Sequence, residues 1–317
     1  MIDDRFIFLM MSKDYTAITA AHNLIKKTAA YIRYILIKRY DVEQPDRQHV
    51  IGQIVSLPLL PEKVGKNAVK RCVKLIRRYN PAVARVACTS LDFPDLEGIN
   101  IIYREGLLRW AAGLCAISSI LAIKASSWAQ QEVVVLGADR APGEMIARYL
   151  GDKVNYLVLA GSDGERLKEL SRGLLTDFGL AAGVYLYSDI CGRRYNIVIS
   201  ADTEMTAGYR INADIVLCYP GQRIIFDEST IVIESGYIDP HSFFYTSAPL
   251  SPLESLYMIE LIGWMQGWLI DVYDGYNVEA LKAIINTINS NEMKLAGFII
   301  EDSALSYNQI RKKLFKA

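Results

Sequence analysis

One segment near the middle of the chain restricts the possible folds more than any other. The run Glu132–Leu136 (EVVVL) is β-branched and apolar, which is typical of a central strand in a parallel sheet. A glycine turn follows at 137–143, and residues 144–150 have the composition of a helix. A second strand at 156–160 and a second helix at 165–178 repeat the pattern. This alternation predicts an α/β fold with a doubly wound parallel sheet of the Rossmann type.

The rest of the chain extends this organisation on both sides. Alternating strands and helices predict an N-terminal α/β domain at 1–125, which we expect to hold a substrate. A Rossmann-type domain is expected at 126–247, followed by a helical segment at 248–317 that packs across both. Further strands are expected at 6–11, 50–57, 83–88, 99–103, 184–187, 197–200, 215–217 and 231–234. Further helices are expected at 15–40, 66–79, 107–124, 253–272, 278–289 and 306–315.

Composition excludes several functional classes. Lys+Arg and Asp+Glu each number 35, so no overall charge attracts nucleic acid or a membrane, and 51% hydrophobic residues exclude general disorder. The longest uncharged apolar run, 110–123, is shorter than the roughly 20 residues that span a bilayer. The first residues are acidic where a signal peptide is basic. We therefore expect a cytoplasmic protein with neither a membrane nor a nucleic acid as its partner.

The cysteines and the hydropathy add two expectations. The five cysteines form no CxxC pair, and with three histidines they form no zinc pattern, so we predict reduced, mostly buried thiols and no metal. Mean hydropathy of +0.15 is high for a soluble monomer and favours a homo-oligomer, most simply a dimer. The cysteines are Cys72, Cys88, Cys115, Cys191 and Cys218.

The glycine turn lies where a dinucleotide fingerprint would lie, between a strand and a helix. In that fingerprint the second glycine lets a pyrophosphate approach bare backbone. Here Asp139 takes that position and Pro142 takes the third, and a carboxylate would repel the pyrophosphate by a few kcal/mol at an effective dielectric of about 20. Arg140 is expected to offset this repulsion. Both a dinucleotide site and a turn without cofactor remain open for Gly137, Ala138, Asp139, Arg140, Ala141, Pro142 and Gly143.

The end of the second strand is expected to select the cofactor. An acidic residue there favours NAD, whereas basic and hydroxyl groups accommodate the 2′-phosphate of NADP. Ser162 and Arg166 suit a phosphate, so NADP is slightly favoured within an NAD(P) prediction. Asp163 lies late for a ribose contact, and we expect it to cap the following helix instead.

Three motifs in this region carry a family resemblance. They are the G-A-x-x-A-x-G turn, the E-R-x-x-E-L run at 165–170 and the strand I-V-I-S-A at 197–201. Together they resemble the shikimate dehydrogenase and glutamyl-tRNA reductase superfamily of NAD(P)-binding domains, over roughly residues 50–240. The run at 50–58 is similar to the N-terminal part of predicted amino-acid dehydrogenases and long-chain acyl carrier protein reductases. The resemblance implies that Ala201, Asp202, Cys218 and Tyr219 lie near a nicotinamide.

The resemblance supplies no catalytic residue. The Lys and Asp pair of shikimate dehydrogenases has no counterpart in the N-terminal domain, and no cysteine matches the one that an acyl reductase acylates. Substrate contacts are expected instead on a strand-end loop, from Thr89, Ser90 and Asp92, although such residues also cap turns. We interpret Cys88 as a buried thiol and His241 as a surface loop residue.

Lysines and arginines gather on the helix expected at 66–79. One interpretation is that this helix binds a nucleic acid or an acidic carrier protein, and the one we prefer is a solvated helix face.

Taken together, the motifs and the resemblance predict an NAD(P)-dependent oxidoreductase of the shikimate or amino-acid dehydrogenase type. It would act on a small polar substrate in a cleft between domains. The alternative is a non-catalytic Rossmann-like protein that binds a ligand or partner, so enzyme status stays open.

Overall fold

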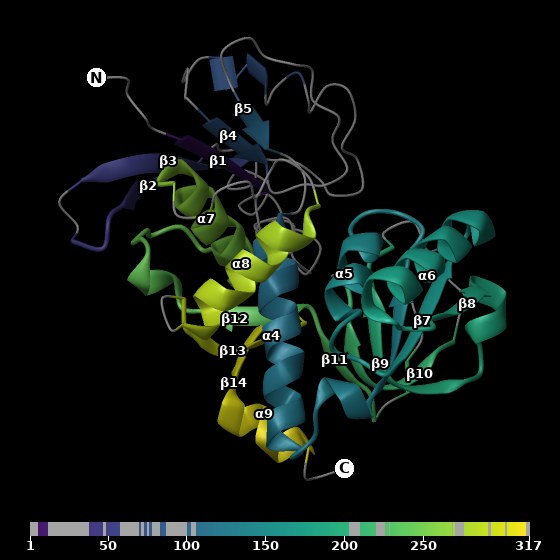
Figure 1. Cartoon of the computed structure of the whole chain (residues 1–317). Coiled ribbons are helices and arrows are strands. Elements are labelled where there is room, and N and C mark those ends of the chain that lie inside the picture. Colours follow the sequence, from purple (N-terminus) through teal and green to yellow (C-terminus); the bar gives the residue numbers. More distant parts are fainter. Residues whose placement is uncertain are drawn as a thin grey trace, which may run out of the picture. The chain divides into compact units, whose positions relative to one another are not determined.

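In the computed structural model the chain forms two compact units. Figure 1 labels the helices and strands of each. One unit contains residues 1–105, 240–250 and 257–265, and the other contains 106–239, 251–256 and 266–317. The structure describes residues 6–11, 38–46, 49–57, 70, 73–74, 76–77, 83–86, 100–102, 106–202, 210–219, 226–227, 229–267, 269, 276–290, 293–301 and 303–314.

The first unit is built on a five-stranded sheet with the order β2-β3-β1-β4-β5. The central strand β1 pairs in parallel with β3 and β4, while β2 runs antiparallel to β3. All described side chains of β1 are buried, which explains the apolar run at 6–10. The strands are β1 (Phe6–Met11), β2 (Lys38–Glu43), β3 (Val50–Leu57), β4 (Val83–Val86) and β5 (Asn100–Ile102).

Two expected helices fall in this unit. The helix expected at 15–40 is wrong for its last three residues, because Lys38 begins strand β2 and pairs with Ser56 of β3. Residues 15–37 lie outside the described part of the chain. In the helix expected at 66–79, the described residues are helical, with Ile76 buried and Lys70 and Arg77 exposed. That pattern agrees with a solvated basic face.

The second unit contains a parallel six-stranded sheet in the order β11-β10-β9-β6-β7-β8. Every pair of neighbouring strands in it is parallel. Numbered along the chain this order is 3-2-1-4-5-6 from β8, which defines a Rossmann-type α/β fold as predicted. The strands are β6 (Glu132–Leu136), β7 (Tyr156–Gly161), β8 (Gly183–Leu186), β9 (Arg194–Ser200), β10 (Asn212–Leu217) and β11 (Ile231–Ile233).

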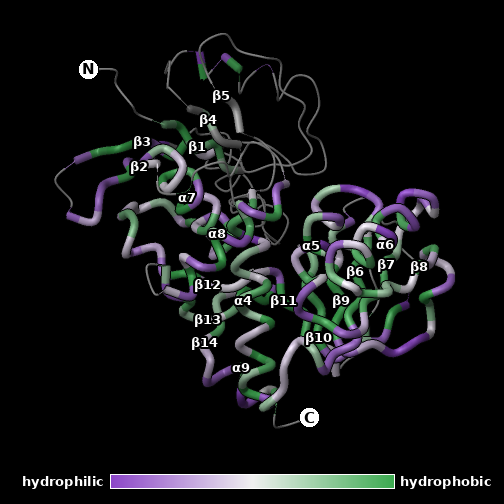
Figure 2. The backbone as a smooth tube through the Cα atoms, viewed as in Figure 1, coloured by the Kyte–Doolittle hydropathy of each residue, from purple (hydrophilic) through white to green (hydrophobic). Residues whose placement is uncertain are grey.

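The core of this sheet consists of β-branched and other apolar side chains on neighbouring strands. Val134, Val198 and Val216 are fully buried in one cluster, with Ala160 of β7 beside them. Figure 2 shows these central strands as hydrophobic, whereas helix α6 (Gly164–Phe178) alternates between hydrophobic and hydrophilic residues. Burial on both faces explains why β6 reads as an uninterrupted apolar run in the sequence.

Three helices support the sheet. Gly113 of α4 lies against Leu217 of β10, where a β-carbon would come within 2.7 Å of the leucine side chain. The helices are α4 (Leu107–Ile123), α5 (Gly143–Leu150) and α6 (Gly164–Phe178).

Within the described residues, no helix is both long enough and apolar enough to cross a membrane.

The C-terminal part combines the expected helices with strands that the sequence pattern did not indicate. A three-stranded antiparallel sheet has the order β12-β13-β14. Gly236 of β12 lies directly under the backbone of α4, where a β-carbon would collide with the carbonyl oxygen of Ala112. The elements are β12 (Ser235–Ile238), α7 (Pro252–Met265), α8 (Val278–Asn289), β13 (Leu295–Ile300), β14 (Ser303–Ser306) and α9 (Tyr307–Leu314).

Candidate functional site

The carboxyl ends of β6, β7 and β9 meet at one edge of the sheet, where the strand order reverses between β6 and β9. Ligands of open α/β sheets bind at such a switch point, so this edge is the candidate site. Gly137 follows β6 with a left-handed φ of 76°. A β-carbon there would lie 2.9 Å from the Cβ of Asp202, which follows β9. Only glycine suits both the turn and this close approach.

The glycine turn is tied to the end of β7. The N–H groups of Gly137 and Ala138 both donate to the carbonyl of Ala160, at 2.8 and 3.1 Å. A β-carbon on Gly143 would collide with the carbonyl oxygen of Gly137. Pro142, at the position of the fingerprint's third glycine, is the N-cap of α5. The close helix–strand approach is therefore provided by Gly143, one residue later than the fingerprint places it.

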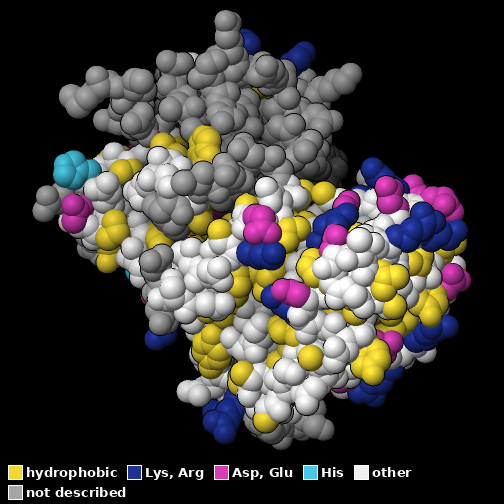
Figure 3. All heavy atoms as spheres, viewed as in Figure 1, with side chains coloured by type: hydrophobic (Ala, Val, Ile, Leu, Met, Phe, Trp, Pro, Cys, Tyr) yellow, Lys and Arg dark blue, Asp and Glu magenta, His cyan; other side chains and the backbone are white. Residues whose placement is uncertain are grey.

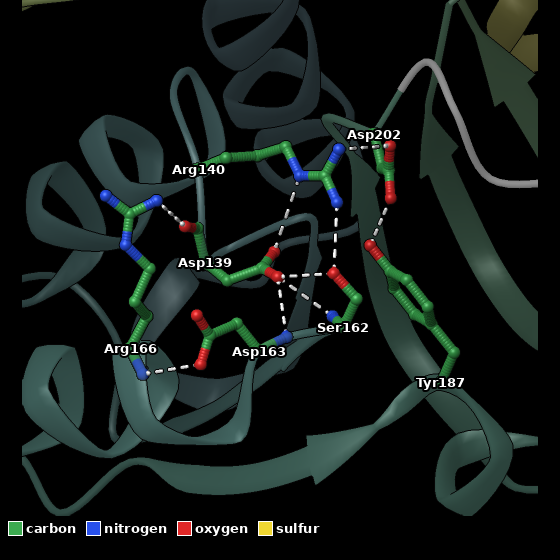
Figure 4. Close-up of polar contacts among 7 residues, drawn as sticks. All are labelled: Asp139, Arg140, Ser162, Asp163, Arg166, Tyr187 and Asp202. Carbon is green, nitrogen blue, oxygen red and sulfur yellow. Dashed lines mark hydrogen bonds and ion pairs between the residues drawn. The ribbon is translucent and has the colours of Figure 1, made fainter.

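Asp139 turns its side chain into the loop that follows β7 (Figure 4). The side chain is 3% exposed. Its Oδ2 accepts hydrogen bonds from the N–H and the hydroxyl of Ser162, both at 2.9 Å, and from the N–H of Asp163 at 2.8 Å. Gly161 makes room for it, because a β-carbon there would collide with the carboxylate. Asp139 therefore accepts the hydrogen bonds that these donors would otherwise make to the ribose, or the ribose phosphate, of a dinucleotide.

The hydrogen bonds keep this buried carboxylate ionised. Burial by itself raises the pKa of Asp139, but the hydrogen bonds from Asp163 and Ser162 outweigh it and hold the pKa below the ordinary value of 3.8. Two guanidinium groups lie close by. Nε of Arg140 is 3.8 Å from Oδ1 of Asp139, and Nη1 of Arg166 donates to the Asp139 carbonyl at 3.3 Å. Arg140 therefore lies within ion-pair distance of Asp139.

Asp202 lies at the β9 side of the same edge. Its side chain is 2% exposed, and its Oδ1 is 3.9 Å from Nη1 of Arg140. The hydroxyl of Tyr187, the first residue of the 3₁₀ helix Tyr187–Ile190, donates to Oδ2 of Asp202. Arg140 also donates to the hydroxyl of Ser162 at 3.0 Å. We call Asp139, Arg140, Ser162, Tyr187 and Asp202 the switch-point network.

Tyr187 is the member of this network that the sequence did not reveal. It was expected to end a strand at 184–187, whereas β8 ends at Leu186. Burial, and then the hydrogen bond to Asp202, raise the pKa of Tyr187 well above that of a free tyrosine, so its hydroxyl stays a donor. The sequence signal that could have identified Tyr187 was its position directly after a strand of the same parallel sheet, since residues that follow such strands gather at one edge.

Asp163 has the role that its position predicted. Its Oδ1 accepts from the N–H groups of Glu165 and Arg166, at 3.1 and 3.2 Å, and so caps α6. The carboxylate of Asp163 therefore serves the helix.

Cys218 and Tyr219 follow β10, close to a buried arginine. Nη2 of Arg109 donates to the Cys218 carbonyl at 2.6 Å, and its guanidinium lies 4.2 Å from the Tyr219 ring centroid. Burial raises the pKa of the Cys218 thiol to about 12, so it is not a nucleophile at neutral pH. Arg109 is 1% exposed. The sequence did not single it out, although a charge beside a long apolar run was a signal.

The other predicted residues divide into described and undescribed ones. Ala201 is buried beside the switch point, where its N–H donates to Leu136, and Ala141 is exposed in the glycine turn. His241 is exposed, with its ring stacked on Tyr245 at 5.6 Å, as a surface residue would be. The proposed substrate contacts Thr89, Ser90 and Asp92, together with Cys88, lie outside the described residues.

The switch-point network does not fit a pyrophosphate in the fingerprint pose. That pose uses glycines at 139 and 142, whereas this chain has Asp139, whose carboxylate is bonded in the loop after β7, and Pro142. A diphosphate there would face two buried carboxylates, with a repulsion on the order of a few kcal/mol at an effective dielectric of about 20. Dinucleotide binding, and the preference for NADP, therefore stay predictions.

Comparison with known proteins returns only solved structures of low sequence identity and low TM-score. No protein-family model matches the chain, and no curated protein matches it significantly. Among solved structures, the chain is similar to L-tryptophan dehydrogenase from Nostoc punctiforme, with 12% identity, coverage of 90% of this chain and 80% of that one, and a TM-score of 0.36. Shikimate dehydrogenase 1 from Peptoclostridium difficile gives 12% identity, 90% and 98% coverage and a TM-score of 0.35. Quinate dehydrogenase from Corynebacterium glutamicum, in complex with NAD, gives 10%, 99% and 99%, and 0.29.

Proposed function

We propose that this chain is a non-catalytic Rossmann-type protein that binds a small ligand or a partner at the carboxyl edge of its six-stranded sheet. The observation that carries the proposal is the buried Asp202, which packs on Gly137 and contacts both Arg140 and Tyr187. These side chains lie at the switch point, where a dinucleotide crosses the sheet in folds of this type. Hydride transfer needs a nicotinamide cofactor, so a chain that binds none would not perform it.

A groove beside the network is the proposed binding place. It has a volume of about 680 Å³ and lies between the start of α6 and the end of β8. Leu186, which is 45% exposed, provides an apolar wall. Tyr185, Lys168 and Asp189 supply an aromatic ring and charges of both signs. Such a mixture suits a small ligand with an apolar body and a few polar groups.

Titration with NADH and NADPH tests the proposal most directly. The wild-type protein is expected to cause no saturable change in nicotinamide fluorescence up to millimolar concentration, while the same sample unfolds cooperatively on heating. Saturable binding of either coenzyme would overturn the proposal.

A ligand screen by thermal shift tests the groove. A small molecule that stabilises the wild type is expected to lose its effect on Leu186→Arg, which places a charge in the apolar wall. The matched control is Leu175→Arg, because Leu175 is 54% exposed on α6 and does not line the groove. Stabilisation that survives Leu186→Arg would place the ligand elsewhere.

An NAD(P)-dependent oxidoreductase is the second candidate, and one observation favours it. The strand order, the left-handed Gly137 and the close approach of Gly143 reproduce the backbone framework of a dinucleotide site. In that case Ala201, Asp202, Cys218 and Tyr219 stay the proposed nicotinamide surroundings. The loop with Thr89, Ser90 and Asp92 stays the proposed substrate contact. The coenzyme titration separates the two candidates.

A further inference from the structure

The turn after β7 holds an anion that belongs to the chain itself. Three donors converge on a single oxygen, Oδ2 of Asp139: two backbone N–H groups and one hydroxyl, at 2.8–2.9 Å. Consecutive N–H groups that point at one oxygen form a concave anion site, and charge makes such hydrogen bonds short and strong. We infer that this turn is an anion-binding cradle, and that Asp139 occupies it as an internal plug that excludes external phosphate groups.

The charges around the cradle support this inference. Arg140 contacts both the Ser162 hydroxyl and Asp139, and Arg166 donates to the Asp139 carbonyl. Asp163 does not compete for the cradle, because its carboxylate caps α6. Removing the Asp139 carboxylate therefore leaves three donors, with the guanidinium group of Arg140 beside them. Asp202 remains on the far side of Arg140, at 3.9 Å.

The space around the cradle admits an external group. Gly161 presents no side chain to the position of the Asp139 carboxylate. Ser162 and Asp163 are exposed, so one oxygen of a phosphate can take the place of Oδ2 while the rest of the ligand stays in solvent. On the face drawn in Figure 3, described acidic and basic side chains are intermixed over α5 and α6. Recognition of an anion there depends on the local donors rather than on a broad positive field.

The ligand class follows from the donor set. A phosphomonoester presents terminal oxygens that accept several hydrogen bonds and pair with arginine. With the Asp139 carboxylate in place, the cradle is expected to bind no phosphomonoester. The inference shares one premise with the proposed function, that this edge of the wild-type sheet does not bind phosphate groups. Its test uses phosphate compounds that contain no nicotinamide.

The experiment measures binding of inorganic phosphate and adenosine 2′-monophosphate by calorimetry. Asp139→Ala is expected to bind adenosine 2′-monophosphate at least about tenfold more tightly than the wild type, equivalent to roughly 1.4 kcal/mol. The double variant with Arg140→Gln is expected to lose most of that gain, because Arg140 is the guanidinium group beside the cradle donors. Asp152→Ala, which removes an exposed aspartate just beyond the C-terminal end of α5, is expected to behave like the wild type. A folded Asp139→Ala protein that binds no better than the wild type would overturn the inference.

A measurement on the wild type covers the case in which Asp139→Ala does not fold. The amide NMR signals of Ser162 and Asp163 are expected to stay unchanged when inorganic phosphate is added, because their N–H groups are already bonded. Saturable shifts of these two signals would show an open cradle and refute the plug. The coenzyme titration is separate: NADH binding to the wild type would overturn the proposed function and leave the plug to be judged by phosphate binding alone.

Discussion

The Asp139 carboxylate accepts a hydrogen bond from the backbone of Asp163 at 2.8 Å, so a side chain from the turn after β6 closes the turn after β7. The two residues lie 24 positions apart in the sequence. Their contact joins the two loops that would surround the adenosine half of a dinucleotide. Most of the expected behaviour of this edge follows from that contact.

Replacing Asp139 is expected to destabilise the protein. Asp139→Ala leaves the N–H groups of Ser162 and Asp163 without their acceptor, and water replaces it only in part. We expect a loss of about 1–3 kcal/mol in the free energy of unfolding, measured by urea denaturation. Asp152→Ala is the matched control and is expected to change little, because Asp152 is exposed. An unchanged stability of Asp139→Ala would contradict the hydrogen bonding described above.

The contribution of Asp139 is expected to depend on pH. Its folded-state pKa lies below the ordinary value of 3.8, so the ionised form is stabilised by folding. That stabilisation is fully present above the unfolded-state pKa and is lost as pH falls through the folded-state pKa. The difference in stability between the wild type and Asp139→Asn should therefore be constant from neutral pH to about 5 and shrink below about 4. A difference that grows in acid would give the opposite sign.

Gly161 and Asp139 are expected to be energetically coupled. Gly161→Ala places a β-carbon against the carboxylate, and overpacking of this kind costs about 1–3 kcal/mol. The same substitution in an Asp139→Ala background should cost much less, because the obstructing atoms are gone. A double-mutant cycle in urea measures the coupling. Additive effects would show that the two side-chain positions do not meet.

Tyr187 is expected to support the buried Asp202. Tyr187→Phe removes the hydroxyl that donates to Oδ2 of Asp202, and a loss of about 1–2 kcal/mol in stability should follow. Tyr156→Phe provides the control, because Tyr156 is 65% exposed on β7. Spectrophotometric titration adds an independent check: Tyr187 should not ionise with the exposed tyrosines, since burial and Asp202 raise its pKa.

The described thiols are expected to differ in reactivity. Burial raises the pKa of Cys115 and Cys218 to about 12, whereas Cys191 is exposed. Brief iodoacetamide treatment followed by peptide mapping should label Cys191 and spare the two buried cysteines, which should become reactive after unfolding. Fast labelling of Cys218 in the folded protein would contradict its burial.

The strands of the Rossmann-type sheet were predictable because their burial leaves a local signal. A strand covered on both faces must be apolar along its length, whichever strand lies beside it. Strand β6 therefore coincides with the expected Glu132–Leu136. Helix α8 coincides with the expected 278–289 because its one buried face gives a helical spacing of apolar residues. The turn glycine Gly137 was also recognisable from a local signal, because a left-handed turn between a strand and a helix restricts the residue type.

Elements defined by distant pairing were not predictable. Strand β12 is the short run Ser235–Ile238, and it exists because it pairs with β13 about 60 residues later and packs on α4. The same holds for Lys38, which helix composition assigned to a helix but which pairs with β3. Local propensity is weak where a partner strand supplies the hydrogen bonds.

The candidate site was predicted in its members but not in its arrangement. Gly137, Arg140, Ser162 and Asp202 were each expected at strand ends, and parallel strands bring those ends together. The direction of the Asp139 side chain was not predictable, because it depends on the space at Gly161 and on donors in another loop. The sequence therefore indicated a repulsive carboxylate where the structure has an internal ligand.

The collision between a β-carbon at 161 and the carboxylate at 139 also constrains how this chain can evolve. A larger residue at 161 is expected to cost less stability once the aspartate has been replaced, which favours substitution at 139 before substitution at 161. Aspartate and glycine codons differ by a single base, which makes the first step accessible to point mutation. A descendant with a side chain at 161 should therefore no longer carry an acid at 139.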